Sequence, residues 1–518
     1  MDLNDLLLVV LAAALAAMWW RRCSRTGGAD GLPPGPPGWP VVGNLFQVIL
    51  QRRPFMYVVR DLRAQYGPIF TLRMGQRTLV VVTSAELIHD ALVKQGAAFA
   101  SRPGDSPTRL LFSVGKCTVN SAPYGPLWRA LRRNFVAEIV SPHRVKGFAW
   151  IREWAAGAHL RRLRAEHRAA GAVRVMPACR LTICSILICI CFGAKIPDEL
   201  IREIEEVLKD VMMMTMPKLP DFLPLLTPLF RRHLADARAL RRRQLACLAP
   251  LVRARREFLR DPSRRLVGGV EMMSAPGEAY VDSLFDLEPP GRGKRLGEEE
   301  LVTLCSEVMS AGTDTSATAL EWAMMHLVLD PAAQERLHHE VVAKVGDATR
   351  ITEQDVEAMP YLQAVVKETF RRHPPSHFVL SHAATRDTEL GGYRVPADAS
   401  VEFYTAWVTE NPATWPDPAA WRPERFLPGG EGFDTDITGT RALRMMPFGA
   451  GRRICPAATL GVLHIHLMLA NMVRAFRWVP PAGEGPPDPT ETFAFTVVMK
   501  NPLRAAIIER AAAAVKAA

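Results

Sequence analysis

Cysteine is scarce in this sequence, with 9 residues among 518, and this shortage excludes a fold held together by disulfide bonds. No pair of cysteines has the spacing of a structural zinc site. Most of them lie in apolar runs, as between Cys184 and Cys191, where a reduced and buried thiol is the ordinary interpretation. Cys455 is different, because it lies in a segment rich in glycine and arginine.

Extremes of composition are also absent. Apolar residues make up 48% of the chain and charged residues 23%, and the mean hydropathy is +0.03. These values exclude wholesale disorder, a collagen-like chain and a multispan membrane protein. The length alone suggests about three domains, but after Asn44 no low-complexity linker and no repeat divides the chain. We therefore expect one large domain over residues 44–518.

Lysine is the rarer cation, because only 11 of the 64 basic residues are lysine. The 53 acidic residues leave a net charge of +11 and a sequence pI near 9.4. Two arginine-rich stretches, residues 161–168 and 231–256, carry cations at mixed spacings with leucine between them. This pattern is typical of solvated helix faces, and we expect no nucleic-acid binding.

One long apolar run, from Leu6 to Trp20, lies near the N-terminus. As a helix it would be about 22 Å long, enough for the thin bilayer of the endoplasmic reticulum. Asp2 and Asp5 precede the run and arginines follow it, which is the reverse of a cleaved signal peptide and predicts a cytosolic body. We expect an uncleaved membrane anchor over residues 1–22 and then a stiff, proline-rich hinge over 23–43.

Short alternating segments predict a few strands in an otherwise helical chain. They cover Ile69 to Leu72 and Thr78 to Val82, with further strand signals near Val401 and Phe493. The expected fold class is therefore mainly α with a small β-sheet region.

The most specific pattern in the sequence is Phe-x-x-Gly-x-Arg-x-Cys, which runs from Phe448 to Cys455. Chance would produce it about 0.0025 times in a chain of this length and composition. Gly449 and Gly451 let the backbone approach a flat ligand closely. The helix expected from Ala458 directs N–H groups at the cysteine and favours its thiolate. Haem iron needs such a thiolate for oxygen cleavage, whereas a lone cysteine would be read as a core thiol.

On this motif, the sequence resembles the cytochromes P450, the haem-thiolate monooxygenases, over nearly its whole length. The resemblance implies the P450 fold and a haem b whose iron is bound by Cys455, with Phe448, Gly449 and Gly451 beside the cofactor. Ala457 stands where the family usually has glycine, which puts the local packing of the loop in question.

A second segment of the resemblance lies within an unbroken helical pattern from Glu298 to Leu329. Gly312 and Thr315 weaken the hydrogen-bond ladder there, and we expect a local bulge that makes room for a diatomic ligand. In the family this segment crosses the haem face opposite the thiolate. The resemblance therefore places Ala311 and Gly312 against haem, gives Thr315 a hydrogen bond to dioxygen, and makes Asp314 a proton relay from solvent.

Four residues correspond to haem-propionate contacts of the family. Trp128 and Arg132 match its Trp-x-x-x-Arg pattern on an early helix. The guanidinium of Arg453 has the shape to pair with a propionate. His382 occupies a position that often supplies another donor, and a surface histidine is the alternative.

Glu368 and Arg371 place opposite charges three residues apart on a predicted helix. The spacing alone means little, because it recurs at Glu199 and Arg202. A downstream Pro-Glu-Arg-Phe segment contains Arg425. In the family, this second arginine joins the glutamate and the first arginine in a buried structural network beneath the haem.

The anchor, the hinge and residues 373–382 resemble plant microsomal P450s. Residues 493–503 and 301–307 resemble family seventy-seven, subfamily A, in-chain hydroxylases and epoxidases of fatty acids in cutin metabolism. By family position the substrate pocket would be apolar. Its lining would come from residues 110–119, 311, 378–380 and 495–497.

Two apolar segments, residues 212–216 and 219–226, could form a pliable channel mouth that dips into the membrane, with plain core as the alternative. No residue identifies itself as an anchor for a substrate carboxylate, and Arg109 is only a guess.

The sequence contains no Gly-x-Gly-x-x-Gly fingerprint and no flavin domain, so electrons must come from another protein. The resemblance implies NADPH as their source and NADPH–cytochrome P450 reductase as the partner, with Arg452 on the docking face. It also implies a single-pass protein of the endoplasmic reticulum membrane.

Three alternatives remain open at this stage. The chain could oxidise another apolar plant metabolite, a phenylpropanoid or a terpenoid. It could be a haem-thiolate isomerase or dehydratase of hydroperoxides, against which the Asp314-Thr315 pair argues, or a haem sensor without catalysis.

Overall fold

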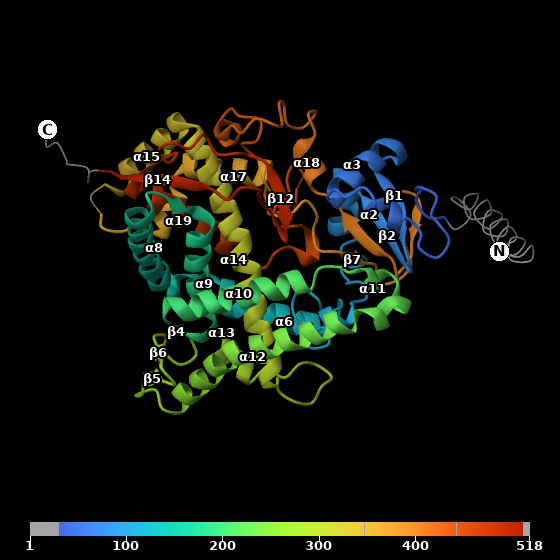
Figure 1. Cartoon of the computed structure of the whole chain (residues 1–518), viewed down its shortest axis with the longest axis horizontal. Coiled ribbons are helices and arrows are strands. Elements are labelled where there is room, and N and C mark those ends of the chain that lie inside the picture. The colour runs from blue at the N-terminus through green and yellow to red at the C-terminus, as the bar shows by residue number, and fades with distance from the viewer. Residues whose placement is uncertain (1–30, 347, 442, 511–518) are drawn as a thin grey trace, which may run out of the picture.

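The computed structural model describes residues 31–346, 348–441 and 443–510, so the expected anchor and the first part of the hinge lie outside the described residues. Helices dominate the described chain (Figure 1). The longer ones are α3 (Phe55–Tyr66), α6 (Pro126–Phe135), α8 (Ala149–Ala170), α9 (Val175–Phe192), α10 (Asp198–Met214), α12 (Arg231–Arg260), α14 (Glu298–Leu329), α15 (Pro331–Val345), α17 (Pro360–Arg372) and α19 (Ala458–Ala475). The shorter ones are α2 (Leu45–Ile49), α4 (Ala85–His89), η1 (Asp90–Lys94), α5 (Pro107–Phe112), η2 (Val136–Val140), α7 (Pro142–Gly147), α11 (Leu219–Phe222), η3 (Pro224–Phe230), α13 (Tyr280–Phe285), α16 (Glu353–Glu357), α18 (Ala406–Glu410), η4 (Pro423–Phe426) and η5 (Gly451–Arg453).

The helix predicted over residues 298–329 is confirmed as α14, which runs through the middle of the molecule (Figure 1). Three glutamates in its first turn suit the positive end of the helix dipole, and the carboxylate of Glu300 accepts the N–H of Gly297 at 2.9 Å. Pro331 begins the next helix, and Asp330 caps it by accepting the N–H of Ala333 at 3.0 Å. Asp330, where the sequence predicts that the helix ends, is therefore both the last cap of α14 and the first cap of α15.

α14 packs closely against α9, the more apolar of the two membrane-length apolar helices among the described residues. A methyl group added at Gly312 would lie 2.8 Å from Cδ1 of Leu187, so the glycine lets the two helices approach. α9 is long and apolar enough to cross a membrane, but 83% of it is buried inside the protein, as in a core helix. The run from Cys184 to Cys191 is buried as predicted.

Three of the four predicted strand segments lie in the main sheet, whose strand order is β1-β2-β10-β7, whereas the segment near Phe493 belongs to a separate two-stranded sheet. β1 (Ile69–Met74) and β2 (Arg77–Val82) form an antiparallel hairpin, β10 (Ser400–Phe403) pairs parallel with β2, and β7 (His382–Ala383) completes the sheet. Strands from both halves of the sequence thus share one sheet, which ties them into one body. The smaller sheets contain β3 (Val173–Arg174), β4 (Ala194–Lys195), β5 (Leu266–Val267), β6 (Val270–Met272), β8 (Thr388–Leu390), β9 (Tyr393–Val395), β11 (Phe476–Val479), β12 (Glu491–Ala494), β13 (Thr496–Met499) and β14 (Arg504–Glu509).

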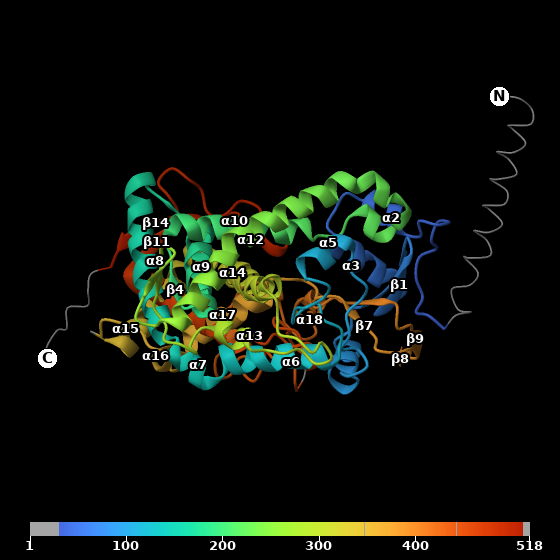
Figure 2. The same ribbon diagram turned by 90° about the horizontal axis from the view of Figure 1, so that it is seen from below.

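The described part of the hinge is not helical, and it is packed onto this sheet. The carbonyl of Pro34 accepts the N–H of Thr71 at 2.8 Å, and the carbonyls of Pro36 and Pro37 accept the side-chain amide of Asn44 at 3.2 Å each. Seen along the sheet, α10 and α12 cover one face of the molecule and α6 and α7 the opposite face (Figure 2).

A buried charge network joins α17 to η4. Both carboxylate oxygens of Glu368 accept hydrogen bonds from Arg371, at 2.7 and 2.8 Å, and one of them also faces Arg425 at 3.3 Å. All three side chains are at most 1% exposed. The two guanidinium groups also donate to carbonyls of residues 409–420. The network therefore fixes a segment that has no regular secondary structure of its own.

Replacing Glu368 by Gln should lower the free energy of unfolding by about 3 to 5 kcal/mol, because it leaves the buried guanidinium of Arg371 without a counter-charge and leaves Arg425 paired with the more exposed Glu431. Urea titration of the purified protein measures the change. Glu199→Gln is the matched control, since Glu199 is paired at the same spacing with Arg202 but is 83% exposed, and we expect a change of at most about 0.5 kcal/mol. Equal losses in both variants would contradict the structural role of the network.

Candidate active site

The loop before α19 carries the Phe-x-x-Gly-x-Arg-x-Cys motif in a tight conformation. The N–H of Cys455 donates to the carbonyl of Phe448 at 2.8 Å. Gly449 and Gly451 have φ angles of +72° and +68°, in the region that favours glycine. A side chain at Gly451 would meet the carbonyl oxygen of Leu92 in η1. The glycines are therefore required by the conformation and packing of the loop.

The Cys455 thiol is partly exposed, whereas six of the eight described cysteines are buried. Burial raises the pKa of Cys455, while the N–H of Ala457 and the nearby Arg132 lower it. The Ala457 amide and Arg132 thus stabilise the thiolate as predicted, but the effect of burial is larger and the pKa of Cys455 is raised. A metal cation at the sulfur would favour the thiolate. Ala457 has a φ of −102°, a conformation that alanine adopts without strain, so this departure from the family pattern costs the backbone nothing.

One face of α14 is partly open although most of the helix is buried. Ala311 is exposed, and Glu307, Gly312 and Thr315 are half-buried. Residues 307, 311 and 315 are one turn apart and share a face, so this face borders an open space in the protein.

The hydroxyl of Thr315 donates to the carbonyl of Ala311 at 2.7 Å. This agrees with the expectation that the hydroxyl competes with backbone N–H groups for the carbonyls of the helix. The expected bulge is wrong, because α14 is a continuous α-helix. A single threonine bond to the carbonyl four residues earlier leaves the ladder intact, and Gly312 accommodates Leu187 of α9.

Asp314 points away from this open face and into the protein. It is 5% exposed and forms an ion pair with Arg180 of α9, whose Nε donates to Glu205 of α10 at 2.6 Å. Burial raises the pKa of Asp314, and Arg180 and Lys209 oppose the shift. The carboxylate thus belongs to a buried network of three helices, and a role in proton relay stays a prediction.

The four residues predicted to contact propionates lie around the cysteine loop. The indole N–H of Trp128 donates to the carbonyl of Val119 at 3.1 Å, and the Arg453 guanidinium lies 4.5 Å from the centre of that indole ring. Arg132 is half-buried, and its positive charge interacts with the thiol of Cys455. His382 is 3% exposed, and its Nδ1 donates to the carbonyl of Phe99 at 2.6 Å. This burial excludes the surface alternative and lowers the pKa of His382 to about 3.

Arg453 has a second function that its sequence position does not reveal. Its Nε, Nη1 and Nη2 donate to the carbonyls of Ala100, Val119 and Ala122 at 2.7, 3.1 and 2.5 Å. Each terminal nitrogen keeps another N–H. The side chain thus connects two loops to the cysteine loop and still has donors for an anionic group.

Comparison with known proteins agrees with this geometry. The sequence profile of the family described as Cytochrome P450 matches residues 33–507. The chain is 36% identical to cytochrome P450 89A9 of Arabidopsis thaliana, over 92% of this chain and 94% of the relative. It is 32% identical to tryptamine 5-hydroxylase of Oryza sativa subsp. japonica, over 97% and 95%. It is 33% identical to 4-hydroxyphenylacetaldehyde oxime monooxygenase of Sorghum bicolor, over 93% and 89%.

Solved structures agree as well. A zebra fish cytochrome P450 with abiraterone superposes with a TM-score of 0.70 at 22% identity, over 88% of this chain and 99% of that chain. The chain therefore belongs to the cytochrome P450 family. It is a P450 monooxygenase of the plant type.

The family implies a haem-thiolate cofactor, and the residues described above fit one. A half-buried cysteine, two glycines in the loop before it and a partly open face of α14 supply a ligand and positions at which no large side chain blocks a flat group. When bound, the haem supplies the activation of O2. Cys455 would supply the thiolate ligand, with the charge of Arg132 acting on its sulfur, while Arg453 ties the surrounding loops together.

Replacing Arg453 by Lys should lower the haem content and cost about 2 kcal/mol of stability, because an ammonium cannot reach three divergent carbonyls. Haem content follows from the pyridine haemochrome assay, and stability from thermal denaturation. Arg452→Lys is the control, because the exposed Arg452 has only a distant aromatic contact, 5.7 Å from the Tyr124 ring. Identical haem content in both variants would contradict the role given to Arg453.

Proposed function

We propose that this protein is a membrane-attached monooxygenase that inserts one oxygen atom of O2 into long-chain fatty acids, by in-chain hydroxylation or epoxidation. The observation that carries the proposal is the position of the segment that resembles family seventy-seven, subfamily A. β12 and β13 form a hairpin whose strand β13 is bound to α14 next to the open face.

Two contacts make this attachment. The hydroxyls of Thr318 and Thr496 lie 3.0 Å apart, and the indole N–H of Trp322 donates to the carbonyl of Val497 at 2.8 Å. Thr318 is three residues from Thr315. At the turn of the hairpin, Phe495 has a φ of +69°, a strained value of the kind that occurs at functional sites.

The chemistry of this hairpin suits an apolar substrate. It brings the turn at Phe495 close to α14, the helix that carries Thr315 and the exposed Ala311. Arg109, the guess for a carboxylate anchor, donates instead to the carbonyl of Thr215 at 2.9 Å. The proposal therefore rests on apolar recognition of the acyl chain and on no ion pair.

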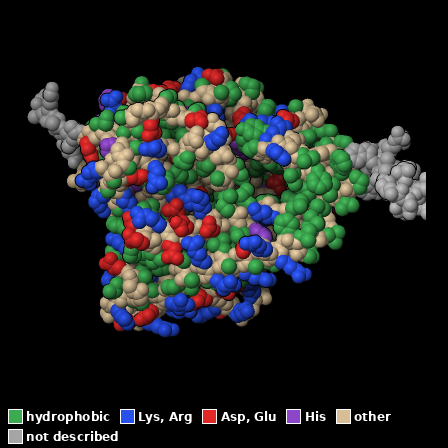
Figure 3. Space-filling model, in the orientation of Figure 1, with side chains coloured by type: hydrophobic (Ala, Val, Ile, Leu, Met, Phe, Trp, Pro, Cys, Tyr) green, Lys and Arg blue, Asp and Glu red, His purple; other side chains and the backbone are tan. Residues whose placement is uncertain are grey.

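An apolar face supports membrane attachment of the body. α2 and α11 both meet the turn between β1 and β2, where Phe222 accepts the N–H of Gln76 at 2.9 Å and Asn44 donates to Arg73. Large exposed apolar side chains gather there, and the face is visible as the green area beside the N-terminal side in Figure 3. They are Trp39, Val41, Ile49, Leu50, Leu225 and Leu229.

This arrangement also bears on the predicted channel mouth. None of the residues of α11 and η3 is buried, so residues 219–226 are not plain core. Met212 is buried, whereas Met213 is 42% exposed. Together with the predicted anchor over residues 1–22, the apolar face supports a location at the endoplasmic reticulum membrane.

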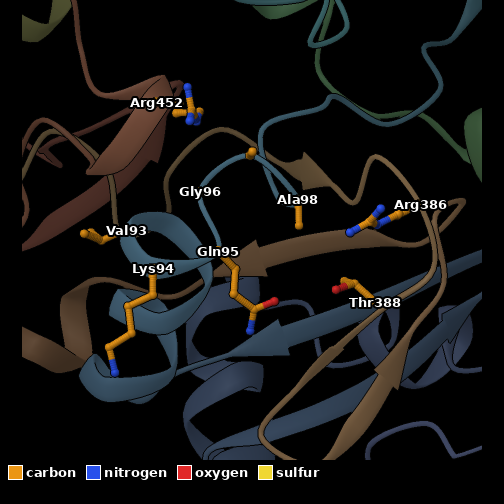
Figure 4. A pocket seen from close by; sticks show the side chains of 9 residues that line it. Val93, Lys94, Gln95, Gly96, Ala98, Arg386, Thr388 and Arg452 are labelled. Carbon is orange, nitrogen blue, oxygen red and sulfur yellow. The ribbon is translucent and has the colours of Figure 1, made fainter.

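A positive hollow beside the cysteine loop supports docking of an acidic reductase that delivers electrons from NADPH. Figure 4 shows this hollow, which has a volume of about 350 Å³. Its lining includes Lys94, Arg386 and Arg452. Among the residues that the structure describes, no carboxylate pairs with these three cations. Such cations suit a negatively charged partner, and one of them, Arg452, is three residues from the proposed thiolate ligand.

The proposal is tested with microsomes that contain the enzyme and a reductase, incubated with NADPH and a panel of fatty acids, flavonoids and indole amines. Mass spectrometry should identify hydroxy or epoxy fatty acids that depend on NADPH. Relatives named for tryptamine and flavonoids make another apolar metabolite the second candidate. Products from that part of the panel, with none from fatty acids, would overturn the fatty-acid assignment.

Thr315→Ala should uncouple the reaction, because it removes the hydroxyl donor on the open face of α14. We expect NADPH consumption to continue while the peroxide formed per NADPH rises about tenfold or more. Thr313→Ala is the control, since its hydroxyl is buried without a partner on another face. Unchanged coupling in Thr315→Ala would refute the proposed role.

A further inference from the structure

The loop over residues 113–122 is built in a strained form. Val114 and Lys116 have φ angles of +46° and +71°, with Gly115 at +66° between them. A left-handed conformation is uncommon for any residue with a side chain, and it is most costly for a β-branched one. Such a loop keeps this form only where other contacts hold it.

Glu307 supplies the strongest of these contacts. One carboxylate oxygen accepts the N–H of Val119 at 2.9 Å, and the other accepts the N–H of Asn120 at 2.6 Å. Hydrogen bonds to an ionised acceptor are stronger than those between neutral groups. Two consecutive amides are therefore held by one side chain of α14.

The same loop is held from the opposite side. The carbonyl of Val119 accepts from both Trp128 and Arg453 at 3.1 Å, and the carbonyl of Asn120 accepts from Arg102 at 2.8 Å. Val119 thus joins α14 to α6 and to the cysteine loop, through its N–H on one side and its carbonyl on the other.

The charge of Glu307 is set by opposing effects. Burial raises its pKa to about 7, while the two amides, Arg453 and Arg102 favour the ionised form. Glu307 lies one turn before Ala311 on the open face of α14, so its two hydrogen bonds to the loop lie at the edge of the active site.

We propose that Glu307 is a positioning residue that clamps loop 113–122 as a wall of the active site, so that opening of this clamp governs ligand access. The proposal goes beyond the substrate assignment and does not depend on it, since the contacts that carry it involve no substrate.

The test compares Glu307→Gln with Glu321→Gln in the full-length holoenzyme. A carboxamide has one acceptor oxygen, so it cannot reproduce the two hydrogen bonds that the carboxylate accepts from the amides of Val119 and Asn120. Glu321 is the matched control, because it lies on the same helix, is buried, and accepts a backbone N–H, that of Leu503 at 2.9 Å. Burial raises its pKa to about 7 as well.

Hydrogen exchange of the Val119 and Asn120 amides should become at least about tenfold faster in Glu307→Gln, as expected for the loss of a hydrogen bond to a charged group. Exchange in α9 should not change. Carbon monoxide rebinding to the reduced enzyme after flash photolysis should become several-fold faster. Neither change should occur in Glu321→Gln.

Unchanged loop exchange in Glu307→Gln, or equal effects in both variants, would overturn the clamp. Faster exchange with unchanged carbon monoxide rebinding would overturn its control of access. If Glu307→Gln does not give a folded holoenzyme, Glu307→Asp against Glu321→Asp makes the same comparison, because the shortened carboxylate cannot reach both amides. None of these measurements involves a fatty acid, so their outcome is separate from that of the substrate panel.

Discussion

The site depends on holding a sulfur in a charged form inside the protein. Burial alone raises the pKa of Cys455 and works against the thiolate. Two groups oppose this effect and lower the pKa of Cys455: the backbone amide of Ala457 and the side chain of Arg132, which lies in α6. Two glycines keep the loop close to its neighbours. The remaining stabilisation must come from a cation at the sulfur, which is why ligand and cofactor form one unit.

Arginine holds the irregular parts of the fold around that sulfur. Arg371, Arg425 and Arg453 each donate to several backbone carbonyls, and Arg102 does the same at three carbonyls. A planar fork with five donors suits this task better than an ammonium group. The preference for arginine over lysine therefore has a structural cause here, because arginine side chains bind the backbone carbonyls of loops that have no regular secondary structure.

Local patterns predicted the parts of the molecule that local chemistry decides. Alternation over Thr78 to Val82 and the proline stop after Leu329 each depend on a few neighbouring residues, and the structure follows both. The cysteine motif was recognisable because its spacing is rare. Its glycines have the positive φ angles that a close approach requires.

Features set by distant residues could not be read in the same way. Gly312 was assigned to a bulge because Leu187 of another helix was not visible from sequence. Asp314 was assigned a proton relay from the family resemblance, and its ion pair with Arg180, 134 positions earlier in the chain, could not be read from the sequence. The clamp at Glu307 was missed because its partners are backbone amides, which carry no sequence signal. Such contacts depend on tertiary packing, and a single sequence does not record them.

The central claim is that Cys455 supplies the thiolate ligand of a haem. The most direct measurement is the carbon monoxide difference spectrum of the reduced protein, recorded for the native chain, for Cys455→Ser and for Cys247→Ser, which removes the other partly exposed cysteine among the residues that the structure describes. We expect a thiolate-type Soret band in the native protein and in Cys247→Ser, and its loss in Cys455→Ser. A thiolate-type band that persists in Cys455→Ser would contradict the claim.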